Sequence, residues 1–163
     1  MNMEQFIEKT GEQTKTSFDK LPDIDLYMDQ VIEYLARQCS CSKDGDKMSG
    51  AMINNYIKDK ILPRTNGKRY GRVHLACLIM IARLKQVLTV KDIGALISEL
   101  GEDDINEYFN AFQGILFKIT EELKNKIPSE DDDLRLMALD FAAAAYVNKT
   151  ACEILLDMID ERK

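Results

Sequence analysis

The feature that most constrains this fold is a long C-terminal segment whose apolar residues follow helical spacing on two sides. The first stripe comprises Leu134, Met137, Phe141, Ala145, Cys152, Leu155 and Ile159, and the second comprises Leu136, Leu139, Ala143, Val147, Ile154 and Met158. A helix that is apolar on two sides must be covered on two sides. The rest of the chain can cover one side. The other is covered either by a second protomer or by deeper burial within one chain.

This helix is predicted to follow the acidic run of residues 129–133 and to end near Asp160. Negative charge at its start complements the positive end of the helix dipole. Four consecutive alanines, residues 142–145, would allow another helix to approach closely. A helix of this length therefore has both an apolar surface and a place for close packing.

Five more helices are predicted upstream from apolar periodicity and from cap and stop residues. They cover about residues 22–38, 50–61, 73–87, 90–100 and 103–126. The polar residues 1–20 are expected to form a loosely held arm. A length of 163 residues suits one domain, or one small domain with an appended helical part. We therefore divide the chain into this arm, a domain of residues 21–100 and a C-terminal helical region of residues 101–163.

A turn signal lies between the second and third predicted helices. Pro63 ends the preceding helix, and Asn66-Gly67 follows it. Asn-Gly is the strongest short-range signal for a β-hairpin, because a type I′ turn needs positive φ at both central residues. The sequence therefore predicts a mainly α fold with a small β-hairpin whose tip is basic.

The charge is segregated along the chain. The net charge of −6 argues against a nucleic-acid partner when it is taken as one number. Counted by segment, however, residues 1–44 carry −4, residues 45–100 carry +6 and residues 101–163 carry −8. Six of the basic residues fall between positions 58 and 72, where Asp59 is the one acid. Such runs are often only solvated surface, but this one coincides with a helix end and the predicted hairpin.

The sequence shows no catalytic, metal-binding or membrane-spanning pattern. Cys39 and Cys41 have one intervening residue, whereas the cysteine pairs of zinc sites have two to four, and no second pair follows. A catalytic pair of His74 and Cys77 would lack a third, orienting group. No apolar run is long enough for a membrane span, and the N-terminus lacks the apolar core of a signal peptide. We expect a non-enzymatic cytoplasmic protein without a cofactor, a metal or membrane contact.

The basic segment and the helix before it carry groups that suit DNA. Asn and Lys side chains on one helix can read base edges in the major groove, and the following cations can bind phosphates. Two adjacent asparagines within a predicted helix indicate a role other than stabilising that helix, because Asn is a poor helix former. The alternative is that they only cap the helix or face water. The candidate DNA-binding residues are Asn54, Asn55, Lys58, Lys60, Arg64, Lys68, Arg69 and Arg72.

Residues 52–63, Met-Ile-Asn-Asn-Tyr-Ile-Lys-Asp-Lys-Ile-Leu-Pro, resemble the recognition helix of MerR-type regulators. In that family an aromatic-containing helix runs into Leu-Leu-Pro and then a basic wing. Residues 67–75 resemble the wing and the start of the next helix, and residues 89–93 resemble the short final helix. The resemblance implies a winged helix-turn-helix that binds DNA.

A closer resemblance is to an uncharacterised family of Gram-positive bacteria, domain-of-unknown-function family 1836. It is carried by residues 21–30, Leu-Pro-Asp-Ile-Asp-Leu-Tyr-Met-Asp-Gln, together with residues 52–56. The two resemblances together cover about residues 21–100. This chain departs from MerR-type regulators in having Asn54 where they usually carry arginine, and about nine residues at 39–47 in place of a tight turn. A helix pair also replaces their long dimerisation helix, so metal sensing is not implied.

We therefore expect a bacterial transcriptional regulator that binds double-stranded DNA through a recognition helix at residues 50–61 and a basic wing at residues 63–72. A homodimer formed by the C-terminal helices would match paired half-sites. A small-molecule effector, of unknown identity, would fit a sensing role for that region. The alternative is a non-enzymatic helical module, derived from a winged helix, that binds a protein or a small ligand.

Overall fold

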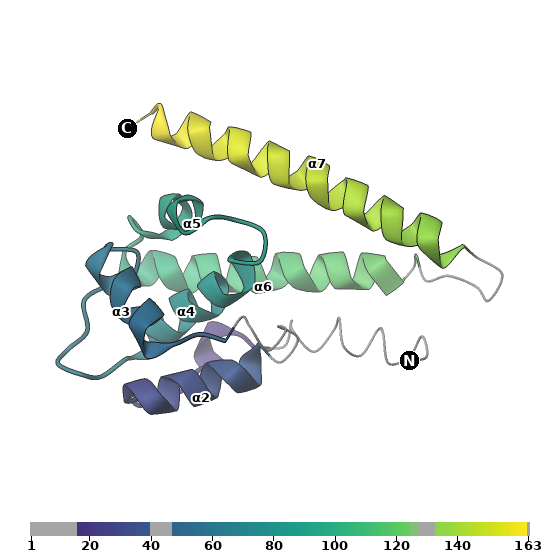
Figure 1. The fold of residues 1–163 in the computed structure, drawn as a ribbon. Coiled ribbons are helices and arrows are strands. Elements are labelled where there is room, and N and C mark those ends of the chain that lie inside the picture. Colours follow the sequence, from purple (N-terminus) through teal and green to yellow (C-terminus); the bar gives the residue numbers. More distant parts are fainter. Residues whose placement is uncertain (1–15, 40–46, 125, 127–132, 163) are drawn as a thin grey trace.

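The computed structural model describes residues 16–39, 47–124, 126 and 133–162 of the chain, and these form a helical fold (Figure 1). The elements are the short 3-10 helix η2 (Phe18–Lys20), α2 (Met28–Gln38), α3 (Gly50–Lys58), α4 (Arg72–Leu84), α5 (Val90–Ile97), α6 (Glu102–Lys124) and α7 (Leu134–Asp160). The predicted helical class is therefore correct. Most of the predicted arm and of the 39–47 loop, and four residues of the acidic run before α7, lie outside the described residues.

The predicted β-hairpin wing is wrong, since the described residues contain no strand or sheet. Residues 66–69 form a tight turn, closed by an isolated bridge between Asn66 and Arg69, with Gly67 at a φ of 65°. The next residue, Tyr70, exchanges backbone hydrogen bonds of 2.9 and 3.0 Å with Leu26, which precedes α2. Because Tyr70 pairs with Leu26, and α4 begins at Arg72, no room remains for a second strand. A turn is therefore present, but Gly67 and Lys68 rather than Asn66 and Gly67 lie at its centre, and the pairing of its flanks is limited to this single bridge. Asn66 lacks the positive φ that the predicted type I′ turn requires.

The same contact moves the start of the first long helix. Residues 22–38 were predicted as helical, whereas α2 begins at Met28. Leu26 is held extended against Tyr70, so the helix can start only after it. The Gln30 side chain then accepts a hydrogen bond of 2.9 Å from the Tyr27 N–H, which caps the first turn.

The remaining predicted helices are present with shifted ends. Helix α3 ends at Lys58 rather than residue 61, α4 ends at Leu84 rather than residue 87, and α5 ends at Ile97 rather than residue 100. The prediction that the last helix ends at Asp160 is confirmed. Helix ends depend on local capping bonds, which apolar periodicity does not reveal.

The core is built around α4. Residues 75–82 are buried without interruption, so this helix is covered on every side. Helix α6 lies along it and contributes Ile105 and Phe109, which are 1% and 0% exposed. The ring of Phe18 in η2 packs edge-on against Phe109 with the ring centroids 6.3 Å apart. One continuous core thus extends from residue 18 to residue 109.

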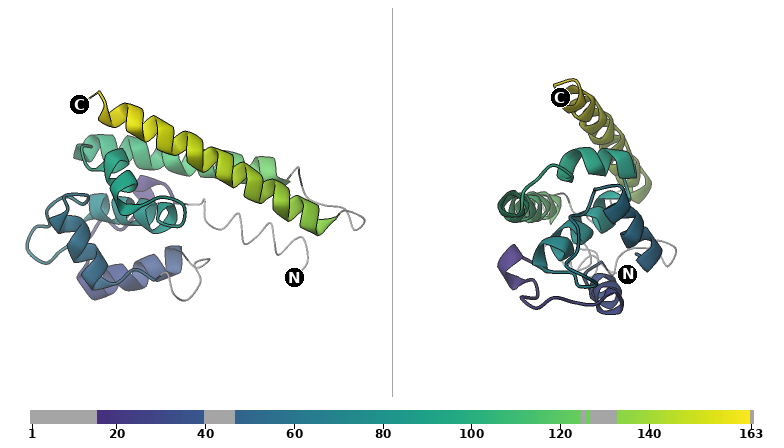
Figure 2. Two further views of the ribbon diagram at one scale, coloured as in Figure 1. Left: turned by 45° about the horizontal axis from the view of Figure 1, so that its top comes forward. Right: turned by 90° about the vertical axis from the view of Figure 1, so that its left-hand side faces the viewer.

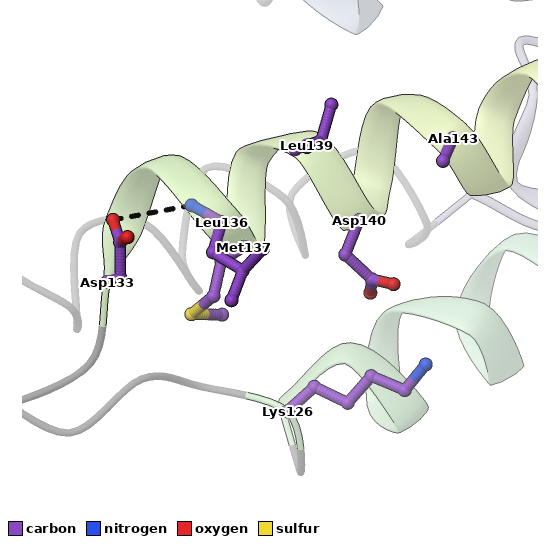
Figure 3. A pocket seen from close by; sticks show the side chains of 7 residues that line it. All are labelled: Lys126, Asp133, Leu136, Met137, Leu139, Asp140 and Ala143. Carbon is purple, nitrogen blue, oxygen red and sulfur yellow. Dashed lines mark hydrogen bonds between the residues drawn. The ribbon is translucent and has the colours of Figure 1, made fainter.

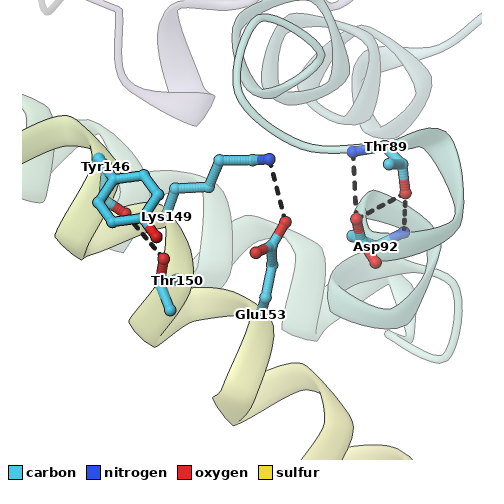
Figure 4. Close-up of polar contacts among 6 residues, drawn as sticks. All are labelled: Thr89, Asp92, Tyr146, Lys149, Thr150 and Glu153. Atoms are coloured by element: carbon cyan, nitrogen blue, oxygen red, sulfur yellow. Dashed lines mark hydrogen bonds and ion pairs between the residues drawn. The ribbon is translucent and has the colours of Figure 1, made fainter. Parts of the chain in front are cut away.

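Helix α7 stands outside this core (Figures 1 and 2). It packs on α5, where Leu156 is buried to 4% exposure. Beside this contact Lys149 and Glu153 form an ion pair of 3.1 Å, near the start of α5 (Figure 4). The rest of the helix is largely exposed, including residues of both apolar stripes. None of the helices in the described ranges is long and apolar enough to cross a membrane.

Candidate nucleic-acid interface

Helix α3 has one buried face and one polar exposed face. Its start is capped by Ser49, whose hydroxyl accepts a hydrogen bond of 3.3 Å from the Met52 N–H. Ile53 and Tyr56 point into the core and are 0% and 4% exposed. The exposed side carries the predicted site residues Asn54, Asn55 and Lys58. Amide and ammonium groups are therefore presented together along one face of a short helix.

The chain reverses sharply after α3. Lys60 adopts a left-handed conformation with a φ of 59°, which residues other than Gly, Asn and Asp rarely occupy. The N–H groups of Ile61 and Leu62 both donate to the Tyr56 carbonyl, at 2.9 and 3.0 Å. These bonds satisfy the end of the helix and bury Ile61 and Leu62, while the Lys60 side chain stays exposed. The following segment is thereby directed away from the core.

Residues 63–71, here called the basic loop, follow directly at the left-hand edge of the molecule in Figure 1. Arg64, Lys68 and Arg69 are all exposed. The Arg69 guanidinium donates a hydrogen bond of 3.1 Å to the Tyr27 hydroxyl and lies 5.2 Å from the centre of that ring. Tyr27 therefore anchors one end of the loop, while the tip with Lys68 has no such anchor among the described residues.

Arg72, the last predicted site residue, is placed differently. It opens α4 and is half-buried, with its guanidinium 5.8 Å from the Phe18 ring centre. Its Nε is buried and has no hydrogen-bond partner in the described part of the chain. The aromatic contact holds this side chain against η2, so Arg72 belongs partly to the structure that supports the loop.

The basic loop also borders a cleft of mixed charge. The cleft holds about 490 Å³ and is lined by Arg64, Arg69 and Arg72. Sequence reasoning missed that Asp23, Asp25 and Glu102 line the same cleft. The positive potential of the three arginines is therefore partly offset on this side. No described residue forms an ion pair with Lys58, Lys60, Arg64 or Lys68.

His74 and Cys77 have structural surroundings. The Gly71 N–H donates to His74 Nδ1 at 3.2 Å, and the His74 ring meets the Tyr70 ring edge-on at 5.8 Å. Burial of Cys77 raises the pKa of its thiol to about 12. A nucleophilic cysteine needs a lowered pKa, so this pair does not have the properties of an activated thiol.

Comparison with known proteins identifies one family. The sequence model of Domain of unknown function (DUF1836) matches residues 16–113, which is more than half of the chain. The matched segment begins just before η2 and ends within α6, so it contains α3, the basic loop and the core around α4. No curated protein and no solved structure matches the chain significantly.

Proposed function

The chain belongs to the DUF1836 family, and we propose that it is a DNA-binding protein that regulates transcription. The observation that carries the proposal is the combined surface of α3 and the basic loop. Exposed Lys58, Lys60, Arg64 and Lys68 make no ion pairs within the described residues, so their charges are not compensated by close contacts. Cations of this kind bind DNA phosphates. Their binding releases the counterions condensed on the DNA, and this release dominates the affinity of a protein for DNA.

Asn54 and Asn55 add the second element of the proposal. Both are exposed on the same face of α3 as Lys58. Asn can form two hydrogen bonds to an adenine edge in the major groove, so an exposed Asn pair is suited to reading sequence. The resemblance of residues 52–63 to the recognition helix of MerR-type regulators points to the same use.

The most direct test is selection of bound fragments from the source genome, followed by affinity measurements across salt concentrations. If phosphates are bound, the logarithm of the association constant falls with the logarithm of salt concentration by about 0.9 per phosphate neutralised. A selection that enriches no fragment at low salt would refute the proposal. It would leave the alternative of a module that binds a protein or a small ligand.

Point variants test the surface itself. Lys68→Ala and Arg64→Ala should each weaken binding to all sequences and reduce the salt slope by about one unit. Asn55→Ala should instead reduce discrimination between sequences, because it removes a base-reading group. Lys118→Ala is the matched control, since Lys118 is an exposed cation on α6. Equal losses of DNA affinity in Lys118→Ala and Lys68→Ala would contradict the assignment of α3 and the basic loop as the DNA-binding surface.

A further inference from the structure

Helix α7 presents an apolar face that the described part of its own chain leaves open. Ten of the eighteen exposed large apolar side chains in the described residues belong to α7, and four more belong to α6. Because α7 buries Leu156 against α5, the helical repeat of 3.6 residues sets which residues point the opposite way. The face opposite Leu156, here called the outer face, comprises the apolar residues Leu136, Leu139, Ala143, Val147, Ile154 and Met158 together with the acidic Asp140.

The outer face is at the upper end of the apolar patches that monomeric proteins expose, and patches of this size are often functional. Leu136, Val147 and Ile154 are 64%, 62% and 55% exposed. A large side chain that is about half exposed presents roughly 100 Å², so the five large side chains of the outer face present on the order of 500 Å² of apolar surface. A standard protein interface buries about 800 Å² on each partner, of which roughly 60% is apolar, so the apolar area of the outer face matches that of one such interface. The polar Thr150 near this face has its hydroxyl satisfied by the Tyr146 carbonyl at 3.0 Å.

The outer face also has a symmetry that favours a second copy of this chain. Val147 lies at its centre, with Leu136 and Met158 each eleven residues away. Ala143 and Ala151 each lie four residues from Val147, so small side chains flank the centre. An antiparallel two-fold pair of α7 helices would therefore place Val147 against Val147 of the other copy. It would also place Ala143 against Ala151 and Leu136 against Met158.

A cleft at one end of the outer face fits this arrangement. It holds about 670 Å³ between the start of α7 and Lys126, which follows α6 (Figure 3). Leu136 and Leu139 line it, and Figure 3 shows Met137 and Asp140 directed across it toward Lys126. In an antiparallel pair, the large Ile154 and Met158 of the other copy would reach this cleft.

Both ends of α7 carry acids and cations. Lys126 and Arg135 are exposed near its start, but the acidic run of residues 129–133 holds four acids there. Asp157, Asp160 and Glu161 lie at its end and are exposed as well. Antiparallel packing opposes the helix dipoles favourably, so the dipoles rather than the side-chain charges favour this orientation.

We propose that the outer face of α7 forms an antiparallel two-fold interface between two copies of this chain, centred on Val147. The surface is separate from α3 and the basic loop, so the inference does not depend on DNA binding. Two helices that meet through small residues approach closely and pack with interdigitated side chains.

Sedimentation and light scattering test the interface. The unaltered chain is expected to be a dimer at micromolar concentration. Val147→Asp places two carboxylates face to face and should raise the dimer dissociation constant roughly thirtyfold or more. Asn148→Asp, one residue along but off the outer face, should leave the dimer intact. Both positions are exposed, so far-ultraviolet circular dichroism should show unchanged helicity in both variants.

Oxidative cross-linking provides an independent measurement. Val147→Cys should form a disulfide-linked dimer, because the two-fold axis brings position 147 of one copy opposite itself. The parent chain, which has four cysteines, and Asn148→Cys should not form that band. A monomeric parent chain at 50 µM, or a dimer that survives Val147→Asp and is not cross-linked through position 147, would overturn the proposal.

Discussion

At the scale of single residues, the Cys77 thiol has a strongly raised pKa. It is fully buried in α4, and this burial raises its pKa from 9.0 to about 12. A raised pKa means that the folded state favours the neutral thiol. The stabilising effect is therefore complete below pH 9 and is lost as the pH rises from 9 toward 12. We expect the free energy of unfolding to fall in this range by up to about 1.4 kcal/mol per pH unit for this group.

Urea unfolding at pH 8, 9.5 and 10.5 measures this dependence. Cys77→Ala is the control, because alanine packs in the same place without a titrating group. The variant should lose less stability between pH 8 and 10.5 than the parent chain. Burial also raises the pKa of Tyr56 and Tyr70, so part of the slope should remain. Identical slopes in both proteins would show that Cys77 does not titrate in this way.

The sequence reveals the site residues individually but not their partners. The exposed positions of Asn54, Asn55 and Lys58 could be inferred, because helical spacing separates them from Ile53 and Tyr56. The contact of Arg69 with Tyr27 could not, since these residues are 42 positions apart. The acids beside the arginines were missed for the same reason. They come from the segment before α2 and from the start of α6, and only the folded backbone brings them together.

At the scale of elements, the start of α5 supports the docking of α7. Asp92 accepts hydrogen bonds from the Thr89 N–H at 3.2 Å and from its hydroxyl at 2.6 Å (Figure 4). The Asp92 N–H in turn donates to the Thr89 hydroxyl at 3.2 Å. Because the two residues cap the helix reciprocally, Thr89→Ala should lower the free energy of unfolding by about 1 kcal/mol.

A double-mutant cycle checks the capping prediction. Asp92→Ala should cost a similar amount, and the double variant should cost less than the sum, because both single variants remove the same contacts. Ser98→Ala, an exposed residue at the other end of α5, serves as the control and should change stability by less than about 0.5 kcal/mol. Strictly additive costs would mean that the two side chains do not act as one cap.

The elements also show where sequence reasoning reached its limit. Apolar periodicity gave the long helices correctly, because a buried stripe at 3.6-residue spacing is a direct consequence of helix packing. It failed at residues 22–27, where Pro22 and Asp23 suited a helix start but Leu26 pairs with Tyr70. A turn does form at residues 66–69, but it is not the predicted type I′ turn, because Gly67 has a positive φ and Asn66 does not. Whether strands form beside a turn depends on a pairing partner, which the local sequence does not specify.

At the scale of the whole molecule, the core crosses the boundary predicted at residue 100. Ile105 and Phe109 of α6 are buried with residues of α4, and the family match also extends to residue 113. The boundary at residue 100 was predicted from the end of a helix there and from the extent of the family resemblance, residues 21–100. The end of a helix, however, says nothing about which apolar side chains share a core. Helix α6 is positioned by the packing of Ile105 and Phe109 into the core. The sequence does not indicate which other helix these two side chains contact.

A pair of phenylalanines on α6 tests how the molecule unfolds. Phe109 is 0% exposed and contacts Phe18, whereas Phe117 is 54% exposed on the same helix. Phe109→Ala should lower the free energy of unfolding by about 3–5 kcal/mol, and Phe117→Ala should change it by less than about 0.5 kcal/mol.

The outcome for Phe109→Ala distinguishes one cooperative unit from two. If the core is shared, helicity and tyrosine fluorescence should be lost together in urea, at a much lower midpoint than in the parent chain. If residues 21–100 fold without α6, the same variant should lose helicity from α6 and α7 first. Tyr56 and Tyr70 would then stay buried until a second transition. Because Phe109 lies between η2 and α4, we expect a single transition, with both signals shifted equally.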